Sequence, residues 1–312
     1  MAIEDKVLKL LRASSNILSG EILAKELKVS RVAIWKTVNR LKERGYPIQI
    51  RKRGYFLENK DIFLKEDLED ITVKSKIFDN FVYLWKTNST MDVARALAEE
   101  GKNVIVLAEC QTQGRGRLGR KWESPLGGLW LTLSLKSSIP LKKSFFLTYL
   151  ASVATAKAIR EVTNLSAKVK WPNDVLVMGK KVAGILLEIK AEVDALIYAL
   201  VGIGINVNNA LSEKPYLIPA ASLKDLVGTP VSRKELLEKL IIEFESLYEN
   251  LDGVLQEWKA LSETLGRQVK VRTLQESIEG VALDLNEDGA LLVKTKEGTI
   301  KAIFSGDCYH LR

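Results

Sequence analysis

The chain has very little of the side-chain chemistry that many enzymes use, with one histidine and two cysteines in 312 residues. Because His310 stands almost at the end of the chain, hydrolysis by a histidine-assisted serine or cysteine is disfavoured. Cys110 and Cys308 form no C-x-x-C motif, which excludes a structural zinc cage and favours reduced thiols over a disulfide. Catalysis in this chain is therefore expected to depend on charge and on positioning.

Long apolar runs are also missing. No stretch approaches the roughly eighteen residues that cross a bilayer, and the first residues, MAIEDKVLKL, are charged, unlike a signal peptide. These features predict a cytoplasmic protein that does not enter a membrane. A length of 312 residues is sufficient for two or three domains.

The net positive charge of the chain comes from its beginning. Residues 1–60 hold fourteen Lys and Arg against six Asp and Glu, a net charge of +8, which equals the formal net charge of the whole chain. The rest of the chain is therefore neutral overall. A basic segment joined to a neutral one predicts that the first meets a polyanion while the second has another function.

The basic segment has the pattern of a winged helix-turn-helix domain. Apolar residues over 3–13 have helical spacing, a second helix is expected to end near Lys28, and a third follows over 31–44. A hairpin with a basic tip at 51–54 would form the wing. The alternative is a small helical bundle whose basic face is merely solvated. The winged helix predicts DNA contacts from seven polar residues: Ser30, Arg31, Lys36, Asn39, Arg40, Lys52 and Arg53.

The remaining chain predicts an α+β fold with a substantial sheet. A charged connector is expected over 59–80, followed by strand-like runs such as FVYLW, NVIVLAE and KVAGILLEI. After Gly266, short strands separated by Asp-Gly and Glu-Gly turns predict a small β-barrel. Amphipathic helices are expected near 89–100, 143–163 and 232–264.

A glycine-rich stretch, QGRGRLGR at residues 113–120, follows the apolar run VIVLAE. Its spacing matches the G-x-G-x-x-G of dinucleotide-binding loops, but Pro125 and the glycines at 127–128 break any helix after it. We therefore reject a dinucleotide site. The stretch instead predicts a cationic loop for phosphate or carboxylate, kept mobile when empty by repulsion between Arg115, Arg117 and Arg120. A second nucleic-acid patch is the alternative.

Three further motifs add to this cationic loop. KWPND places Lys170, Asn173 and Asp174 around a proline turn between two strand-like runs, and KKVAGILLE places Lys181 at the start of a strand. GIGIN ends another strand with small residues. Cations, one acid and bare backbone, with no histidine or thiol nucleophile, fit nucleotide chemistry on a carboxylate.

In this order, the motifs resemble those of the bifunctional biotin-protein ligase and biotin operon repressor family along essentially the whole chain. They are NST, QTQGRGRLGRKW, KWPND, KVAGIL and GIGIN, between the winged helix and the barrel. The resemblance implies a class II synthetase-like catalytic domain with a mixed sheet, and a C-terminal SH3-like β-barrel. The implied regions are a DNA-binding domain at 1–60, a linker at 61–80, a catalytic domain at 81–265 and the barrel at 266–312.

The chemistry that the resemblance implies has two steps. Biotin and ATP, with Mg²⁺, form biotinyl-5'-AMP and pyrophosphate, and the acyl group then passes to a lysine of a biotin carboxyl carrier protein domain. Biotinyl-AMP would also act as corepressor for a homodimer on operator DNA. Two alternatives remain open: a ligase whose winged helix no longer regulates, and a ligand-sensing repressor without ligase activity.

The resemblance also implies the site residues. Catalytic roles fall to Arg115, Arg117, Asp174 and Lys181. Biotin contacts fall to Ser89, Thr90, Gln111, Gly114, Arg115, Arg117, Lys181, Gly184, Gly202 and Gly204. ATP and adenylate contacts fall to Arg117, Arg120, Trp122, Lys170, Asn173, Asp174, Lys181, Asn206 and Arg312. No protein cage is expected for the metal, since Mg²⁺ would arrive with ATP. Leu118 and Met91 depart from the arginine and asparagine that are frequent in the family at these positions.

Overall fold

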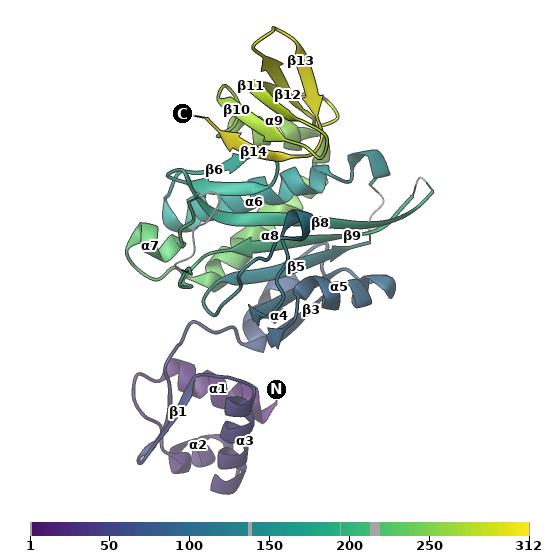
Figure 1. Ribbon diagram of the computed structural model, residues 1–312. Coiled ribbons are helices and arrows are strands. Elements are labelled where there is room, and N and C mark those ends of the chain that lie inside the picture. Colours follow the sequence, from purple (N-terminus) through teal and green to yellow (C-terminus); the bar gives the residue numbers. More distant parts are fainter. Residues whose placement is uncertain (1, 137–138, 194, 213–218, 312) are drawn as a thin grey trace.

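The computed structural model describes residues 2–136, 139–193, 195–212 and 219–311 (Figure 1). In chain order they form a small helical head, a central mixed sheet with helices, and a C-terminal antiparallel sheet. The α+β class expected from the sequence is therefore confirmed. Arg312, one of the predicted nucleotide contacts, lies outside the described residues.

The head is a helix-turn-helix with a two-stranded wing. The hydroxyls of Ser19 and Ser30 accept hydrogen bonds of 3.1 Å from backbone N–H groups and so cap its second and third helices. Lys52 and Arg53 form the exposed turn of the wing, as the sequence predicted. The elements of the head are α1 (Ile3–Ala13), α2 (Gly20–Leu27), α3 (Arg31–Glu43), β1 (Ile48–Arg51) and β2 (Gly54–Leu57).

The connector predicted over 59–80 contains a helix, α4 (Lys65–Lys74). The side chains of Leu68 and Ile71 are buried in the same hydrophobic cluster as the central sheet. Because α4 is short and mostly polar, its sequence is typical of a charged linker. Tertiary packing of its two apolar residues supplies the stability that such a short helix lacks alone.

The central sheet has seven strands. The pair β3–β4 is parallel and every other neighbouring pair is antiparallel. Along β4 the side chains alternate: Val104 and Val106 pack in the cluster of α5 (Thr90–Glu99), while Ile105 and Leu107 pack in the main core. The strand order is β3 (Asn80–Thr87), β4 (Val104–Gln111), β5 (Leu129–Leu135), β9 (Ala195–Ile205), β8 (Lys180–Glu192), β7 (Asp174–Val177) and β6 (Ala167–Lys170).

The other helices differ from the sequence predictions in two places. The helix expected near 232–264 is divided, because a short 3-10 turn over Leu251–Gly253 separates two helices. Gly253 and the polar residues before it are poor helix formers, which accounts for the break. A further short helix, α7 (Leu223–Val227), was not predicted. The remaining helices are α6 (Phe146–Thr163), α8 (Arg233–Glu249) and α9 (Val254–Ala260). No described helix is both long and apolar enough to cross a membrane.

The C-terminal part is a five-stranded antiparallel sheet whose buried side chains join the main core. The hydroxyl of Tyr149 on α6 donates a hydrogen bond of 2.6 Å to the carbonyl of Gly289, which ties this sheet to the central part. In order across the sheet, the strands are β13 (Ile300–Ile303), β12 (Leu291–Thr295), β11 (Ser277–Leu285), β10 (Gln268–Arg272) and β14 (Asp307–His310).

The buried guanidinium of Arg233 joins the segment that follows the head, at Asp61, to the central sheet. Arg233 is 1% exposed and donates to Asp61 Oδ2 at 2.8 Å, to Glu109 Oε2 at 2.8 Å and to the carbonyl of Gly128 at 2.9 Å. Glu109, 2% exposed, also accepts a 2.8 Å hydrogen bond from the Tyr83 hydroxyl. The segment around Asp61 is thereby fixed to β4 through a buried Arg233–Glu109 ion pair, while Asp61 itself stays partly exposed.

Two further contacts join the head itself to the rest of the chain. The rings of Tyr46 and Trp85 stack with their centroids 4.1 Å apart. Arg12 on α1 forms an ion pair of 2.5 Å with Asp67 on α4. These contacts join the head to β3 and to α4, and Figure 1 shows the head below the central sheet.

Candidate active site

A cavity of about 490 Å³ opens on the central sheet, between the loop at 113–124 and strand β14. Fifteen of the residues predicted as biotin or nucleotide contacts line it. Gly114 is not among the lining residues, but its carbonyl accepts a 2.9 Å hydrogen bond from Trp122 N. The lining residues are Ser89, Thr90, Gln111, Arg115, Arg117, Arg120, Trp122, Lys170, Asn173, Asp174, Lys181, Gly184, Gly202, Gly204 and Asn206.

The Trp122 ring lies on a part of the sheet where glycines leave no side chains. A Cβ atom on Gly204 would stand 2.5 Å from Trp122 Nε1, and one on Gly184 would stand 3.0 Å from the same ring. The ring can lie flat on β8 and β9 only because these positions lack side chains. Trp122 Nε1 is buried and has no hydrogen-bond partner among the described residues, so it is a donor available to a ligand.

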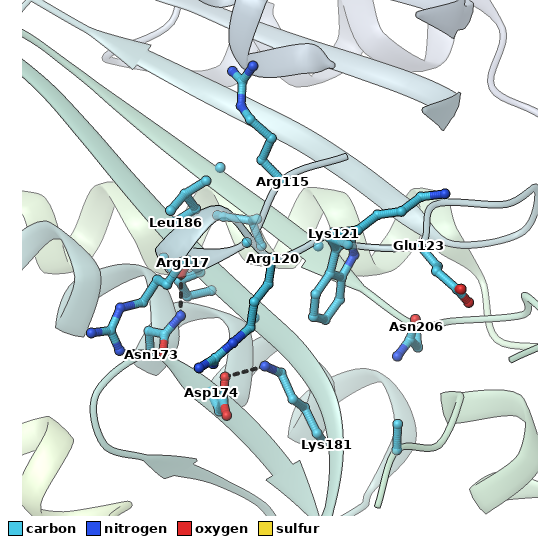
Figure 2. Close-up of a pocket in the computed structure, with 18 of the residues that line it drawn as sticks. Arg115, Arg117, Arg120, Lys121, Glu123, Asn173, Asp174, Lys181, Leu186 and Asn206 are labelled. Atoms are coloured by element: carbon cyan, nitrogen blue, oxygen red, sulfur yellow. Dashed lines mark hydrogen bonds and ion pairs between the residues drawn. The ribbon is translucent and has the colours of Figure 1, made fainter. Parts of the chain in front are cut away.

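An ion pair stands at the end of the cavity. The distance between Lys181 Nζ and Asp174 Oδ1 is 2.5 Å, and the same Nζ lies 5.1 Å from the centre of a Trp122 ring (Figure 2). The turn that follows β6 places Asp174 opposite Gly184, on the neighbouring strand. Lys170, at the end of β6, is 4% exposed, and burial lowers the pKa of its ammonium group. Two lysines and one carboxylate therefore share one poorly solvated region.

A polar cluster lines another part of the cavity. The side-chain oxygen of Gln111 accepts hydrogen bonds from the backbone N–H and the hydroxyl of Thr90, at 2.8 and 3.1 Å. Its amide nitrogen donates to Ser124 Oγ at 2.9 Å. Ser89, 1% exposed, caps α5. The sequence motif NST and the end of strand β4 thus meet in one hydrogen-bonded cluster.

In the glycine-rich loop at 113–120, each arginine contacts a different set of partners. Arg117 Nη1 donates to Asn173 Oδ1 at 3.3 Å and to the carbonyl of Gly306 at 3.2 Å. Burial lowers the pKa of Arg117, which nevertheless stays charged. Leu118, at the loop's tip, has φ +56° and is 58% exposed. No α-helix follows the loop, in agreement with the rejection of a dinucleotide site.

Arg115 points away from the Asp174–Lys181 pair, as Figure 2 shows. Its guanidinium donates to Asp92 Oδ1 at 2.8 Å and lies 3.8 Å from Glu188 Oε1. These two acids attract it to the outer side of the loop. Of the four residues predicted as catalytic, Arg115 is thus the one that the structure does not bring close to the others.

Three lining residues that the sequence did not predict come from β14: Asp307, Cys308 and Tyr309. Asp307 accepts a 3.0 Å hydrogen bond from Arg120 Nη1, and this contact lowers the pKa of its carboxyl. Burial raises the pKa of the Cys308 thiol to about 11, so this cysteine is no thiolate nucleophile at neutral pH. No local pattern marks these residues, because their role depends on how the C-terminal sheet is docked.

A resident metal site was not predicted, and the described residues contain no group of three or more His, Cys, Asp and Glu side chains that would hold an ion. Near the Lys181 ammonium, Asp174 is the buried carboxylate of the cavity. One carboxylate together with phosphate oxygens suits Mg²⁺ that arrives as a nucleotide complex.

Comparison with known proteins agrees with this architecture. Residues 83–206 match the biotin/lipoate A/B protein ligase family, residues 264–311 the biotin protein ligase C-terminal domain, and residues 4–56 an HTH domain. The fold and its cationic cavity thus define a ligase with a DNA-binding head. The chain belongs to the biotin protein ligase family.

Individual relatives cover nearly the whole chain. The bifunctional ligase/repressor BirA of Bacillus subtilis is 34% identical over 308 residues, which are 95% of this chain and 94% of that protein. The BirA of Escherichia coli is 28% identical, with the same coverage of both chains. The biotin protein ligase of Aquifex aeolicus in complex with biotin and ATP superposes with a TM-score of 0.63, at 32% identity, over 75% of this chain and all of that one.

Proposed function

We propose that this chain activates biotin with ATP to biotinyl-5'-AMP and transfers the biotin to a lysine of a biotin carrier protein. We also propose that it represses biotin genes through its winged helix. The observation that carries the ligase function is the cavity itself, which three cations line, Arg117, Lys170 and Lys181. Lys181 pairs there with the buried carboxylate of Asp174, and Gly184, Gly202 and Gly204 form its glycine floor. We further assign residues 1–60 to the DNA-binding domain, 81–265 to the catalytic domain and 266–312 to the barrel.

In the first step, the carboxylate of biotin attacks the α-phosphorus of ATP, which brings two anions together. Lys181 and Arg117 supply positive charge for the oxygens on which charge accumulates, in a region of low solvation. Because both cations are already held, by Asp174 and by Asn173, they need little reorganisation when the reaction occurs. Asp174 and the phosphate oxygens would hold the Mg²⁺ that arrives with ATP, which would supply positive charge to the departing pyrophosphate.

The second step needs less from the enzyme, since the acyl-adenylate is already activated. The amine of the carrier lysine attacks the acyl carbon and AMP leaves, so the enzyme has to exclude water and to accept the proton that the amine loses. Asp174, 6% exposed and facing the cavity, is our candidate for the proton acceptor. Asn206, Gln111 and Thr90 would orient the substrate without entering the chemistry.

As partners we infer a biotin carboxyl carrier protein domain and operator DNA, in the cytoplasm. When biotinyl-AMP fills the cavity, we propose that the chain forms a homodimer, which would present two winged helices to a palindromic operator. In the structure Arg115 and Arg120 of the loop at 113–120 pair with Asp92 and Asp307; phosphate contacts would draw these arginines to the ligand and thus couple occupancy to assembly.

The test of the ligase function is incubation of the chain with ATP, Mg²⁺, biotin and a biotin-carrier domain, followed by mass spectrometry of that domain. A mass increase of one biotinyl group supports the proposal. Unmodified carrier, in a reaction that still releases pyrophosphate in a biotin-dependent way, limits the chain to adenylate formation. Absence of both would leave a ligand-sensing repressor.

The wing provides a test of DNA binding. Replacing Lys52 and Arg53 by glutamate should abolish binding to the operator duplex and remove its salt dependence, because two phosphate-facing cations become anions. Fluorescence anisotropy at several salt concentrations measures the affinity for DNA and its salt dependence. Replacing Lys296, which lies in the exposed turn after β12, by glutamate is the control and should leave binding unchanged. Equal DNA affinity in the wing variant and the control would refute the role of the wing.

The glycine floor predicts a specific defect. In Gly204→Ala, the new Cβ would collide with Trp122, and relieving the clash should weaken binding of biotin or adenylate by about 10- to 100-fold, in line with the cost of overpacking. Isothermal titration measures the affinity, and tryptophan fluorescence reports the displaced ring. Gly20→Ala, in the head and away from the cavity, is the matched control, since the nearest atom to its new Cβ is at an ordinary 3.5 Å. Equal affinities in both variants would contradict the prediction.

A further inference from the structure

The recognition helix α3 carries apolar side chains on the face that it does not bury. Its buried residues, Ile34, Val38 and Leu41 among them, form the core of the head. On the opposite side, Val32 is 61% exposed and Trp35 is 53% exposed. They stand three positions apart and are therefore neighbours on one helix face. Two large apolar residues together on a solvated helix face indicate a surface that meets a partner.

The polar neighbours of this face narrow the choice of partner. A hollow beside Trp35 is lined also by Lys36, Asn39, Arg40 and Glu43. The Arg40 guanidinium lies 3.6 Å from Glu4 on α1, which also holds Arg44 at 2.7 Å. Arg40, one of the predicted DNA contacts, is thus drawn toward α1. The first turns of α3 present Val32, Trp35, Lys36 and Asn39 outward.

Charge and position both favour duplex DNA as the occupant. Residues 1–60 have a net charge of +8, and the wing exposes Lys52 and Arg53 for the phosphate backbone. In a helix-turn-helix, the first turns of the second helix contact base edges in the major groove. The apolar group on those edges is the C5-methyl of thymine, while adenine offers N6 and N7 to an asparagine side chain.

We propose that Val32 and Trp35 contact thymine methyl groups and that Asn39 pairs with adenine, so that this chain selects half-sites with A·T pairs under the first three turns of α3. This inference rests on the proposed repressor function and adds its sequence preference. Lys36 and the wing then supply affinity, while the apolar pair supplies discrimination.

The experiment uses the full chain with biotin, ATP and Mg²⁺ to select a duplex from a random-sequence library. Thymines of the selected duplex are then replaced one at a time by deoxyuridine, which removes only the methyl group. Affinity should fall about 4-fold for each contacted methyl, as the loss of one buried methylene-sized group implies, and about 15-fold for a symmetric pair. Anisotropy titration measures each ratio.

Protein variants test which side chain contacts each thymine methyl group. In Trp35→Ala the ratio between thymine and deoxyuridine duplexes should fall to about 1 for at least one position, and Val32→Ala should do the same at a neighbouring base. Lys36→Ala should weaken binding to both duplexes equally and keep the ratio. Because Val32 and Trp35 are exposed, circular dichroism of the variants should match that of the parent chain.

The outcomes separate the two proposals. If no sequence is enriched by the selection, the repressor function fails, and this inference fails with it. If a sequence is enriched but deoxyuridine changes the affinity less than twofold at every position, only the methyl-reading inference is overturned. A Trp35→Ala variant that keeps the full penalty overturns the assignment to Trp35.

Discussion

In Lys181→Ala, formation of biotinyl-adenylate should fall by about 10²- to 10³-fold while biotin affinity changes by less than about threefold, the pattern of a lost transition-state contact. The reason lies in the position of the ammonium group. It is 2.5 Å from Asp174 and lines the cavity beside the Trp122 ring, so it is placed to meet charge that appears only as the carboxylate attacks phosphorus. Ground-state biotin does not require that charge to the same extent.

Pyrophosphate exchange measures the rate of adenylate formation, and calorimetric titration measures the affinity for biotin. Lys180→Ala is the matched control, because Lys180 is adjacent in the chain and exposed, and it should behave like the parent chain. A loss of equal size in adenylate formation and in biotin binding would show that Lys181 contributes uniform binding and not transition-state stabilisation.

In Arg233→Met, the free energy of unfolding of the central sheet should fall by about 3–5 kcal/mol, because removal of the guanidinium leaves the buried charge of Glu109 without its partner. Glu109 is 2% exposed and would keep the Tyr83 hydroxyl as a partner while losing the guanidinium. Asp61 and the carbonyl of Gly128 would lose donors as well. Urea titration followed by intrinsic tryptophan fluorescence measures the loss.

Two variants make this prediction specific. Lys234→Met changes the next residue of α8, whose ammonium pairs with Asp67 at 3.1 Å from a half-exposed position, and should cost less than about 1 kcal/mol. Combining Arg233→Met with Glu109→Met removes both charges and should recover part of the loss. If Arg233→Met is as stable as Lys234→Met, the buried network does not stabilise the sheet.

Much of the site was predictable because its motifs are local. KWPND places a lysine, an amide and an acid on one turn, and the structure brings Lys170, Asn173 and Asp174 to the same cavity. GIGIN and KVAGIL lie on adjacent antiparallel strands, so that Gly184 pairs with Gly204. Helix caps, the wing turn and the alternation of strands depend on neighbouring residues alone, which is why they appear in the sequence.

Contacts between distant segments were not predictable. Asp307 reaches Arg120 only because the C-terminal sheet packs on α6, and nothing around Asp307 in the chain marks it. The connector helix α4 is stabilised by burial of Leu68 and Ile71 against the sheet, and propensity alone favours a linker. The direction of Arg115 depends on Asp92 and Glu188, acids that belong to two other elements.

The sequence by itself determined the order of the domains, the division of charge between a basic head and a neutral body, and the chemical types that fill the cavity. These properties belong to composition and to spacing within single elements. The tertiary structure decided which partner each arginine of the loop takes, that β14 lines the cavity, and that the buried guanidinium of Arg233 joins Asp61 to β4. It decided also that Trp35 is exposed, because only packing determines which face of a helix stays in water.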